Sequence, residues 1–178
     1  MPSTDLRARP AAGDYPTFHA GYVTAVPDVD VITALRDGGR DLLATLKGIP
    51  EARAGFRYAE GKWSIRELMG HVIDAERIFT YRALRIARGD ATPLPGFEEN
   101  DYAAAAGSDA RPLADLAKEF DAVRAASVLL FESFPADAWT RRGIVNGGEV
   151  SMRALAFITT GHALHHLKIL RERYDVGR

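Results

Sequence analysis

Cysteine is absent from this sequence of 178 residues. Without it the chain has no disulfide bonds, thiolate metal ligands or cysteine nucleophile, so any thiol chemistry must bring its sulfur on a substrate. Long apolar runs are also absent: none approaches the roughly 20 residues that span a bilayer, and the N-terminus lacks the hydrophobic segment of a signal peptide. We therefore expect a cytoplasmic protein without membrane contacts.

An excess of charge of either sign is missing as well. Lys and Arg number 23 against 24 Asp and Glu, which leaves a formal net charge of -1. This balance provides no excess of positive charge for binding nucleic acid, so a small-molecule substrate is the expected partner. The chain does contain 47% hydrophobic and 26% charged residues, as an ordinary globular protein does. Its length suits one domain with a sizeable core.

Residues 1–29 are rich in Pro, Gly and Ala and show no helical period, so we expect a partly flexible N-terminal arm that forms no helix of its own. Its first dozen residues are expected to be mobile. Large apolar side chains then follow at a spacing too close for all of them to remain exposed to solvent. They predict an extended arm lying on the domain, and they are Tyr15, Phe18, Tyr22, Val23 and Val26.

Residues 30–178 contain four segments with helical period, which predict an all-α four-helix bundle. The first helix begins near Asp28 or Asp30, either of which can cap it, and Pro50 ends it. Its buried face is formed by Val31, Leu35, Leu42, Leu46 and Ile49.

The second helix has the clearest start in the chain. Ser64 and Glu67 form a capping box, in which each side chain accepts a hydrogen bond from the other residue's backbone amide. The helix then runs to about Arg88, where Gly89 is a natural stop.

The third helix begins at Pro112 and ends at Pro135. A tight-turn signal at Asn146-Gly147-Gly148 precedes the fourth helix, which begins at Ser151 or a neighbour. The buried face of the third helix is formed by Leu113, Leu116, Phe120, Val123, Ser127, Leu130 and Phe134.

The connection between the second and third helices, residues 90–111, is long for neighbouring antiparallel helices, and such loops are often functional. It is long enough to cross the full length of a bundle, which allows the two helices to run parallel. Its acidic cluster is either a solvated turn or a lid over a site, and it comprises Glu98, Glu99, Asn100 and Asp101.

Three histidines point into the predicted core. At about 100° per residue, His162 and His166 share the middle of an apolar stripe on the last helix, whereas His165 lies about 60° to one side. His71 lies on the buried face of the second helix, with Arg82 within about 60° of it. An i, i+4 pair of histidines lets two ring nitrogens converge on one ion. A buried histidine is more often a hydrogen-bonded core residue, but three from two helices favour a metal site.

The opposite face of the last helix is also apolar, through Phe157, Thr160, Leu164 and Leu167. An outer helix of a four-helix monomer should be polar there. Either the N-terminal arm or a second subunit covers this strip, and we favour a homodimer.

The segments KWSIRELMGHVIDAER, LPGFEENDY and NGGEVSMRALAFITTGHALHH together resemble the DinB/YfiT-like superfamily of damage-inducible metalloenzymes, which is unrelated to the DNA polymerase that shares the name. The similarity covers nearly the whole chain from residue 15 onward. It implies a four-helix bundle with a long crossover and a metal ion bound by three histidines. Matched residue by residue, the ligands are His71, His162 and His166, and His19 in the arm has no part in the site.

Three neutral imidazoles suit zinc, nickel, iron or copper, and we expect zinc or nickel. They leave a coordination position open, where a metal lowers the pKa of bound water to about 7 or holds a thiol as its thiolate. Each imidazole needs an acceptor for its second nitrogen. The candidates beside the ligands are Asp74, Glu67 and His165, although Glu67 is more simply used by its capping box.

Relatives in this superfamily include S-transferases and isomerases that use bacillithiol, mycothiol or glutathione. The resemblance therefore implies a metal-dependent enzyme, with a low-molecular-weight thiol as cosubstrate, that transfers the thiol to small electrophilic compounds. A metal-dependent hydrolase is the alternative within the enzyme class. A non-catalytic stress protein that binds a metal or small molecule is a third hypothesis, which a fourth protein ligand such as Glu98 or Asp101 would favour.

Overall fold

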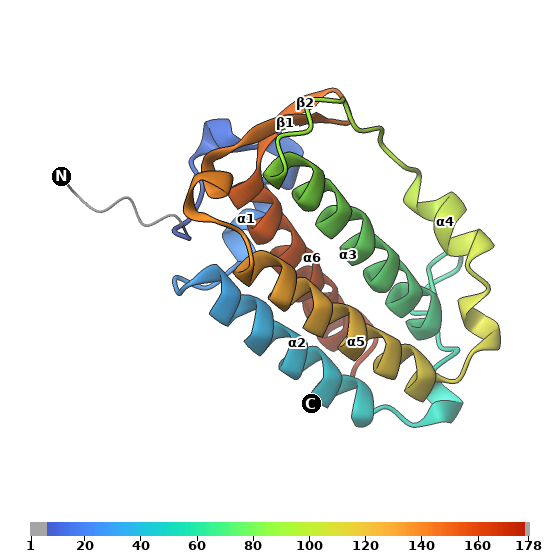
Figure 1. Ribbon diagram of the computed structural model, residues 1–178. Coiled ribbons are helices and arrows are strands. Elements are labelled where there is room, and N and C mark those ends of the chain that lie inside the picture. The colour runs from blue at the N-terminus through green and yellow to red at the C-terminus, as the bar shows by residue number, and fades with distance from the viewer. Residues whose placement is uncertain (1–6, 177–178) are drawn as a thin grey trace.

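The computed structural model describes residues 7–176, and it is an all-α four-helix bundle with one small hairpin (Figure 1). The predicted fold class is confirmed. The bundle helices are α2 (Val31–Lys47), α3 (Ile65–Ala87), α5 (Leu113–Glu132) and α6 (Met152–Arg173). The shorter elements are α1 (Ala20–Ala25), α4 (Glu99–Ala105), β1 (Arg142–Val145), β2 (Gly148–Ser151) and the 3-10 turns Ala12–Asp14, Thr17–His19, Glu51–Arg53, Ser108–Ala110 and Ala136–Thr140.

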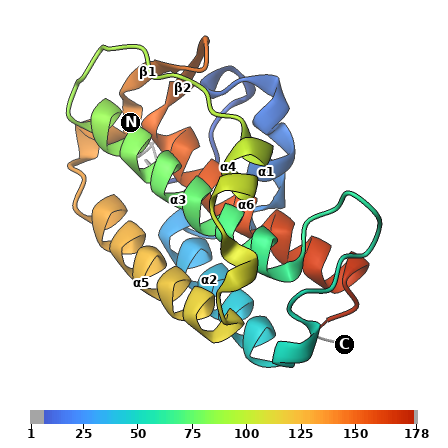
Figure 2. The same ribbon diagram turned by 90° about the vertical axis from the view of Figure 1, so that its right-hand side faces the viewer.

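The long crossover lets α3 and α5 run parallel, as its length predicted. In Figure 1 both helices run from the lower right to the upper left, whereas α2 and α6 run in the opposite direction. The crossover therefore returns along the whole bundle, and it carries α4, which packs against α3 (Figure 2). Its start is fixed to the hairpin, because Leu94 donates a hydrogen bond to Ile144 O and accepts one from the Asn146 amide, each at 2.9 Å.

The helices begin where the sequence places their caps. The Asp30 carboxylate accepts hydrogen bonds from the amides of Ile32 and Thr33, both at 3.1 Å. The Ser64 amide donates to Glu67 at 2.8 Å, and the Glu67 amide donates to Ser64 Oγ at 3.0 Å, which completes the capping box. Such caps contribute about 1 kcal/mol each, so the helix starts are locally specified.

The predicted buried faces form the core. All five stripe residues of α2 and its C-terminal extension are buried. Of the residues predicted to form the buried face of α5 and of the two residues after it, only Val123 and Leu130 are half-buried. The buried ones are Leu113, Leu116, Phe120, Ser127 and Phe134. None of the helices within residues 7–176 combines the length and apolarity that crossing a membrane requires.

A buried ion pair, which the hydrophobic pattern did not indicate, joins three of the helices. Arg124 of α5 donates to both carboxylate oxygens of Glu76 on α3, at 2.8 and 2.7 Å. It also donates to Leu35 O of α2 at 2.7 Å. The two side chains are only 5% and 2% exposed, so each charge depends on the other for compensation.

The N-terminal arm lies on the domain but is not extended. It forms α1, and the prediction that it has no helix was wrong, because packing of Val23 against the bundle outweighs the weak local propensity. Arg9 ties the arm together by donating to Val23 O and, at 2.6 Å, to Val26 O. Of the residues predicted to be mobile, 1–6 lie outside the described residues, and the next ones include this ordered arginine.

The arm and α2 cover the apolar strip on α6. Phe157 and Leu167 are 1% and 3% exposed within the single chain. Arg9 lies over the Phe157 ring, 5.8 Å from its centroid, and Gly38 of α2 packs against Leu164. A single chain therefore buries this strip, and the homodimer stays a prediction that the strip no longer supports.

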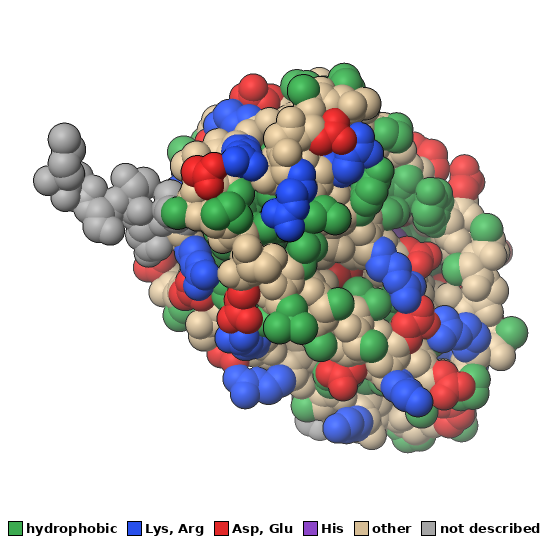
Figure 3. Space-filling model, in the orientation of Figure 1, with side chains coloured by type: hydrophobic (Ala, Val, Ile, Leu, Met, Phe, Trp, Pro, Cys, Tyr) green, Lys and Arg blue, Asp and Glu red, His purple; other side chains and the backbone are tan. Residues whose placement is uncertain are grey.

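The tight-turn signal marks a β-hairpin that the helical analysis missed. Strands β1 and β2 pair antiparallel, and their turn residues Asn146 and Gly147 have φ values of 49° and 75°. Positive φ at both central positions is typical of a type I′ turn. Four-residue strands are too short for a period to reveal them. On the face of the molecule in Figure 3, acidic and basic side chains are interspersed, in keeping with the balanced charge.

Candidate metal centre

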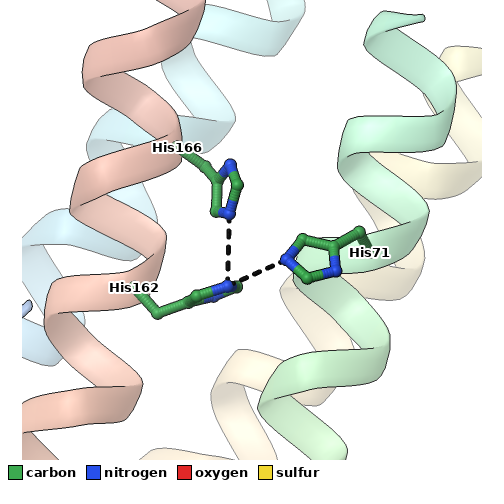
Figure 4. Close-up of side chains that lie close together, drawn as sticks. All are labelled: His71, His162 and His166. Atoms are coloured by element: carbon green, nitrogen blue, oxygen red, sulfur yellow. Dashed lines mark hydrogen bonds between the residues drawn. The ribbon is translucent and has the colours of Figure 1, made fainter. Parts of the chain in front are cut away.

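His71 of α3 and His162 and His166 of α6 point toward one another in the core (Figure 4). The Nε2 atom of His162 lies 2.9 Å from that of His71 and 3.2 Å from that of His166. The potential ligand atoms of all three lie within 4.8 Å of one another. The side chains that helix phase turned inward are therefore brought to a single point, and all three are buried.

The surrounding aromatic rings fix these imidazoles. Trp63 lies 4.6 Å from His71, centroid to centroid. His162 is flanked edge-on by Tyr22 of the arm at 5.3 Å and by Phe79 of α3 at 5.4 Å. Because packed rings have few alternative rotamers, these contacts restrict the orientation of His71 and His162.

Burial keeps the three imidazoles neutral. It lowers the pKa of His71 from 6.5 to about 4. Burial, and next to it the neighbouring histidines, hold the pKa values of His162 and His166 well below 6.5. A neutral imidazole offers a lone pair, which is the form that binds a metal.

The arrangement fits a transition-metal ion. Nitrogen ligands at about 2.0–2.1 Å from a tetrahedral zinc ion lie about 3.3 Å from one another. The two Nε2 separations of 2.9 and 3.2 Å are close to this value. A neutral imidazole nitrogen offers either one proton or one lone pair, so Nε2 of His162 cannot make a full hydrogen bond to both of its neighbours. The buried Nδ1 of His166 has no hydrogen-bond partner among the described residues.

The side chains predicted to support the ligands have other partners. Glu67 accepts the Ser64 amide and pairs with Arg57, so its capping role prevails. Asp74 pairs with Arg77 at 3.8 Å, and burial raises its pKa. Within residues 7–176 neither carboxylate hydrogen-bonds to the three imidazoles. His165 is exposed and stacks edge-on against Tyr22 at 5.4 Å.

A cavity of about 320 Å³ opens beside the histidines and is lined by both His71 and His162. Phe79, Val150 and Leu155 give it apolar walls. The acidic part of the crossover borders it through Glu98, Glu99 and Asn100, which are exposed to solvent and line the cavity as well. The acidic segment is therefore both exposed to solvent and adjacent to the candidate site, so a solvated turn and a lid over a site are compatible interpretations.

Two further lining residues lie outside the predicted site. His19 lines the cavity although its place in the arm suggested that it has no part in the site, because α1 folds back onto α6. Nothing in the local sequence indicates this long-range contact. Arg82 also lines the cavity and is 7% exposed. Helix phase had placed it on the face of His71, so an arginine on a buried face was the available signal.

Several known proteins share this fold. A protein of Geobacillus kaustophilus (strain HTA426) named "Putative metal-dependent hydrolase" is 24% identical over 151 residues, which cover 84% of this chain and 82% of that protein. YfiT from Bacillus subtilis, described as "a probable metal-dependent hydrolase with an unusual four-helix bundle topology", has a TM-score of 0.74 over 82% of this chain and 84% of its own, at 12% identity.

A mycothiol-dependent maleylpyruvate isomerase has a TM-score of 0.66 at 18% identity and matches 78% of this chain and 58% of its own. At these identities the two structures show the fold alone. The profile of the DinB superfamily matches residues 34–170, which include α3, the crossover and all three histidines. The chain therefore belongs to the DinB superfamily.

Proposed function

We propose that this protein is a metal-dependent enzyme whose ion is held by His71, His162 and His166. The observation that carries the proposal is the convergence of three buried histidines, two of which line a cavity. When bound, a transition metal supplies Lewis acidity there, which lowers the pKa of a coordinated water or thiol. The relative named as a metal-dependent hydrolase supports a metal cofactor. Zinc or nickel is the ion that we expect.

The absence of a fourth protein ligand favours catalysis over storage. Among residues 7–176, the group that converges contains the three histidines and no carboxylate. Glu98, one of the two side chains that would favour storage, is exposed at the rim of the cavity. An open position beside a cavity is the pattern of catalytic rather than structural zinc sites.

The leading reaction is transfer of a low-molecular-weight thiol to a small electrophilic compound. A second cavity, of about 280 Å³, lies on the side of His166, and both cavities share Tyr22, Glu99 and Asn100 as a wall. Two separate cavities that meet at one centre suit two substrates. In the transfer, the thiol sulfur forms a bond to an electrophilic carbon, and the thiol proton leaves with the displaced group or joins the product. The absence of cysteine is compatible, because the sulfur arrives on the cosubstrate.

Hydrolysis is the alternative, favoured by the names of two relatives. In that reaction water replaces the thiol and the second cavity needs no occupant. We place either reaction in the cytoplasm, where low-molecular-weight thiols are kept reduced.

The first experiment is metal analysis by mass spectrometry of untagged protein beside His71→Ala. We expect about one equivalent of zinc or nickel per chain, lost in the variant. The control is His165→Ala, which replaces an exposed histidine of α6 and should keep its metal. If the folded wild-type protein does not bind added zinc or nickel, the proposal is wrong.

The second experiment separates the two reactions. Metal-loaded protein is supplied with bacillithiol, mycothiol or glutathione and a chloronitroarene, and in parallel with simple esters. Consumption of thiol that disappears in His166→Ala supports transfer, whereas ester cleavage without thiol supports hydrolysis. Full turnover in His166→Ala would remove the catalytic role of the centre.

A further inference from the structure

The cavity beside the histidines contains a buried cation without a carboxylate partner. Arg82 is 7% exposed and lines this cavity. Its guanidinium donates to Pro95 O at 2.7 Å and lies over the Phe97 ring, 5.7 Å from its centroid. Within residues 7–176 it forms no ion pair, whereas Arg124, at 4% exposed, is paired with Glu76 through two hydrogen bonds. A buried charge without a counterion is costly, so it calls for an anionic ligand.

Arg82 and His71 both line the cavity from α3. They lie on the same face of that helix, eleven residues apart, which separates their backbones by about 16 Å along the helix axis. The lining also includes the apolar side chains of Phe79, Val150 and Leu155. The cavity therefore combines two of the three histidines with apolar walls and the cationic Arg82.

His19 adds a second unpartnered polar group that lines this cavity. Its Nδ1 atom is buried and has no hydrogen-bond partner among the described residues. Burial lowers the pKa of His19 to about 4, and the charge of Arg82 adds to this effect. A neutral imidazole beside a guanidinium provides one more ring nitrogen for a shared ligand.

The acidic residues of the cavity do not neutralise Arg82. Glu99 is exposed, and its charge acts on Tyr22 and His165, raising the pKa of the former and opposing the lowering of the latter. Tyr22 packs against His162, and His165 packs against His166. Glu98 is exposed as well, where water and salt screen its charge. Within residues 7–176, none of the acidic side chains that line the cavity therefore pairs with the buried guanidinium.

We propose that Arg82, assisted by His19, binds a carboxylate of a small substrate whose reactive group lies at the three histidines. The inference rests on the proposed function and narrows its substrate class. It predicts a ligand with an anionic group, an apolar part and an electrophilic or metal-binding group.

The first test needs no metal. Binding of hexanoate and of its neutral amide to metal-free protein is compared by NMR. We expect a preference for the carboxylate of about ten- to a hundredfold, the range of a hydrogen bond to a charged group. Arg82→Gln should abolish this preference, and His19→Phe should reduce it. Arg85→Gln is the matched control, because Arg85 lies three residues further on α3 and pairs with Asp90.

The second test connects the histidines with Arg82. Zinc-loaded protein is titrated calorimetrically with terminal mercapto acids of increasing chain length and with the corresponding mercapto alcohols. The preference for the acid should be largest at the chain length that reaches from the histidines to Arg82. It should vanish in Arg82→Gln while zinc content stays unchanged.

Each outcome decides between the two proposals. A preference for hexanoate that Arg82→Gln leaves intact would overturn the carboxylate subsite. Equal loss of acid and amide binding in that variant would also overturn it, because Arg82 would then only hold the crossover through Pro95. Failure of the protein to bind zinc would sink the proposed function, and the hexanoate comparison would still decide the subsite.

Discussion

At the scale of single residues, His162 has the central position. Its Nε2 atom contacts those of both other histidines, and Tyr22 and Phe79 enclose its ring. Burial holds the three imidazoles neutral, which is the form that the proposed metal site requires. The same burial makes the metal-free protein sensitive to acid.

Proton binding by these imidazoles predicts how the stability of metal-free protein depends on pH. Burial lowers the pKa of His71 from 6.5 to about 4. Between these values the unfolded chain binds more protons than the folded one, so the free energy of unfolding falls as the pH falls from about 6.5 to about 4. Denaturant unfolding across this range measures the decline. It should be shallower in His71→Gln, and identical slopes for the two proteins would contradict the assignment.

At the scale of elements, the arm is held on α6 by a close backbone contact. A Cβ atom at Gly161 would lie 1.9 Å from the carbonyl oxygen of Tyr22, so only glycine lets α1 approach this closely. This contact places Tyr22 beside His162 and brings His19 to the cavity.

Gly161→Ala should therefore displace α1. We expect a destabilisation of about 1–3 kcal/mol, the usual cost of overpacking, measured by thermal unfolding, together with faster proteolysis of the arm. Gly21→Ala is the control, since no atom lies within 4 Å of its added Cβ and alanine favours the helix by about 0.5–1 kcal/mol. Unchanged stability of Gly161→Ala would show that the contact is not tight.

The buried pair between α3 and α5 predicts strong coupling between two substitutions. Arg124→Met leaves the Glu76 carboxylate buried and unpaired, which should cost about 3–5 kcal/mol. Adding Glu76→Leu should restore much of this loss, because no charge is then left in the core. Arg36→Met, which removes an exposed pair with Glu132, should cost less than about 1 kcal/mol. A double-mutant cycle by denaturant unfolding measures the coupling, and additive losses would refute it.

At the scale of the whole molecule, sequence patterns predicted the four long helices, because short-range interactions such as caps specify where these helices begin. The caps at Asp30, Ser64 and Ser151 satisfy backbone amides within one turn, so their position is visible in the sequence. The buried face of a helix can likewise be found from the sequence of that helix alone. This pattern predicted that His71 points inward, although the partner helix was not known.

Contacts between distant segments were not predictable in this way. The helix in the arm forms because α6 offers it a groove at Gly161, and composition alone indicated an extended chain. The same contact brings His19 to the cavity. The strip from which a second subunit was inferred is covered by Arg9 of the arm and by α2. The strands of the hairpin likewise depend on their pairing with each other and with Leu94.

The proposed metal site has ligands on both α3 and α6, so metal binding there should stabilise the whole molecule. An ion that binds only the folded state, at a hundredfold excess over its Kd, contributes about 2.7 kcal/mol. For a chain of this size the Tm should rise by about 5–11 °C. Calorimetry with added zinc measures this rise, which a chelator should reverse.

The variants separate the centre from weaker surface sites. His71→Ala removes the only ligand that α3 supplies to the histidine group, so it should lose the thermal shift even if α6 still binds zinc weakly. His165→Ala should keep the full shift, because that exposed side chain lies outside the group. An equal shift in wild type and His71→Ala would mean that zinc binds elsewhere, and that the convergence of α3 and α6 serves packing rather than a metal.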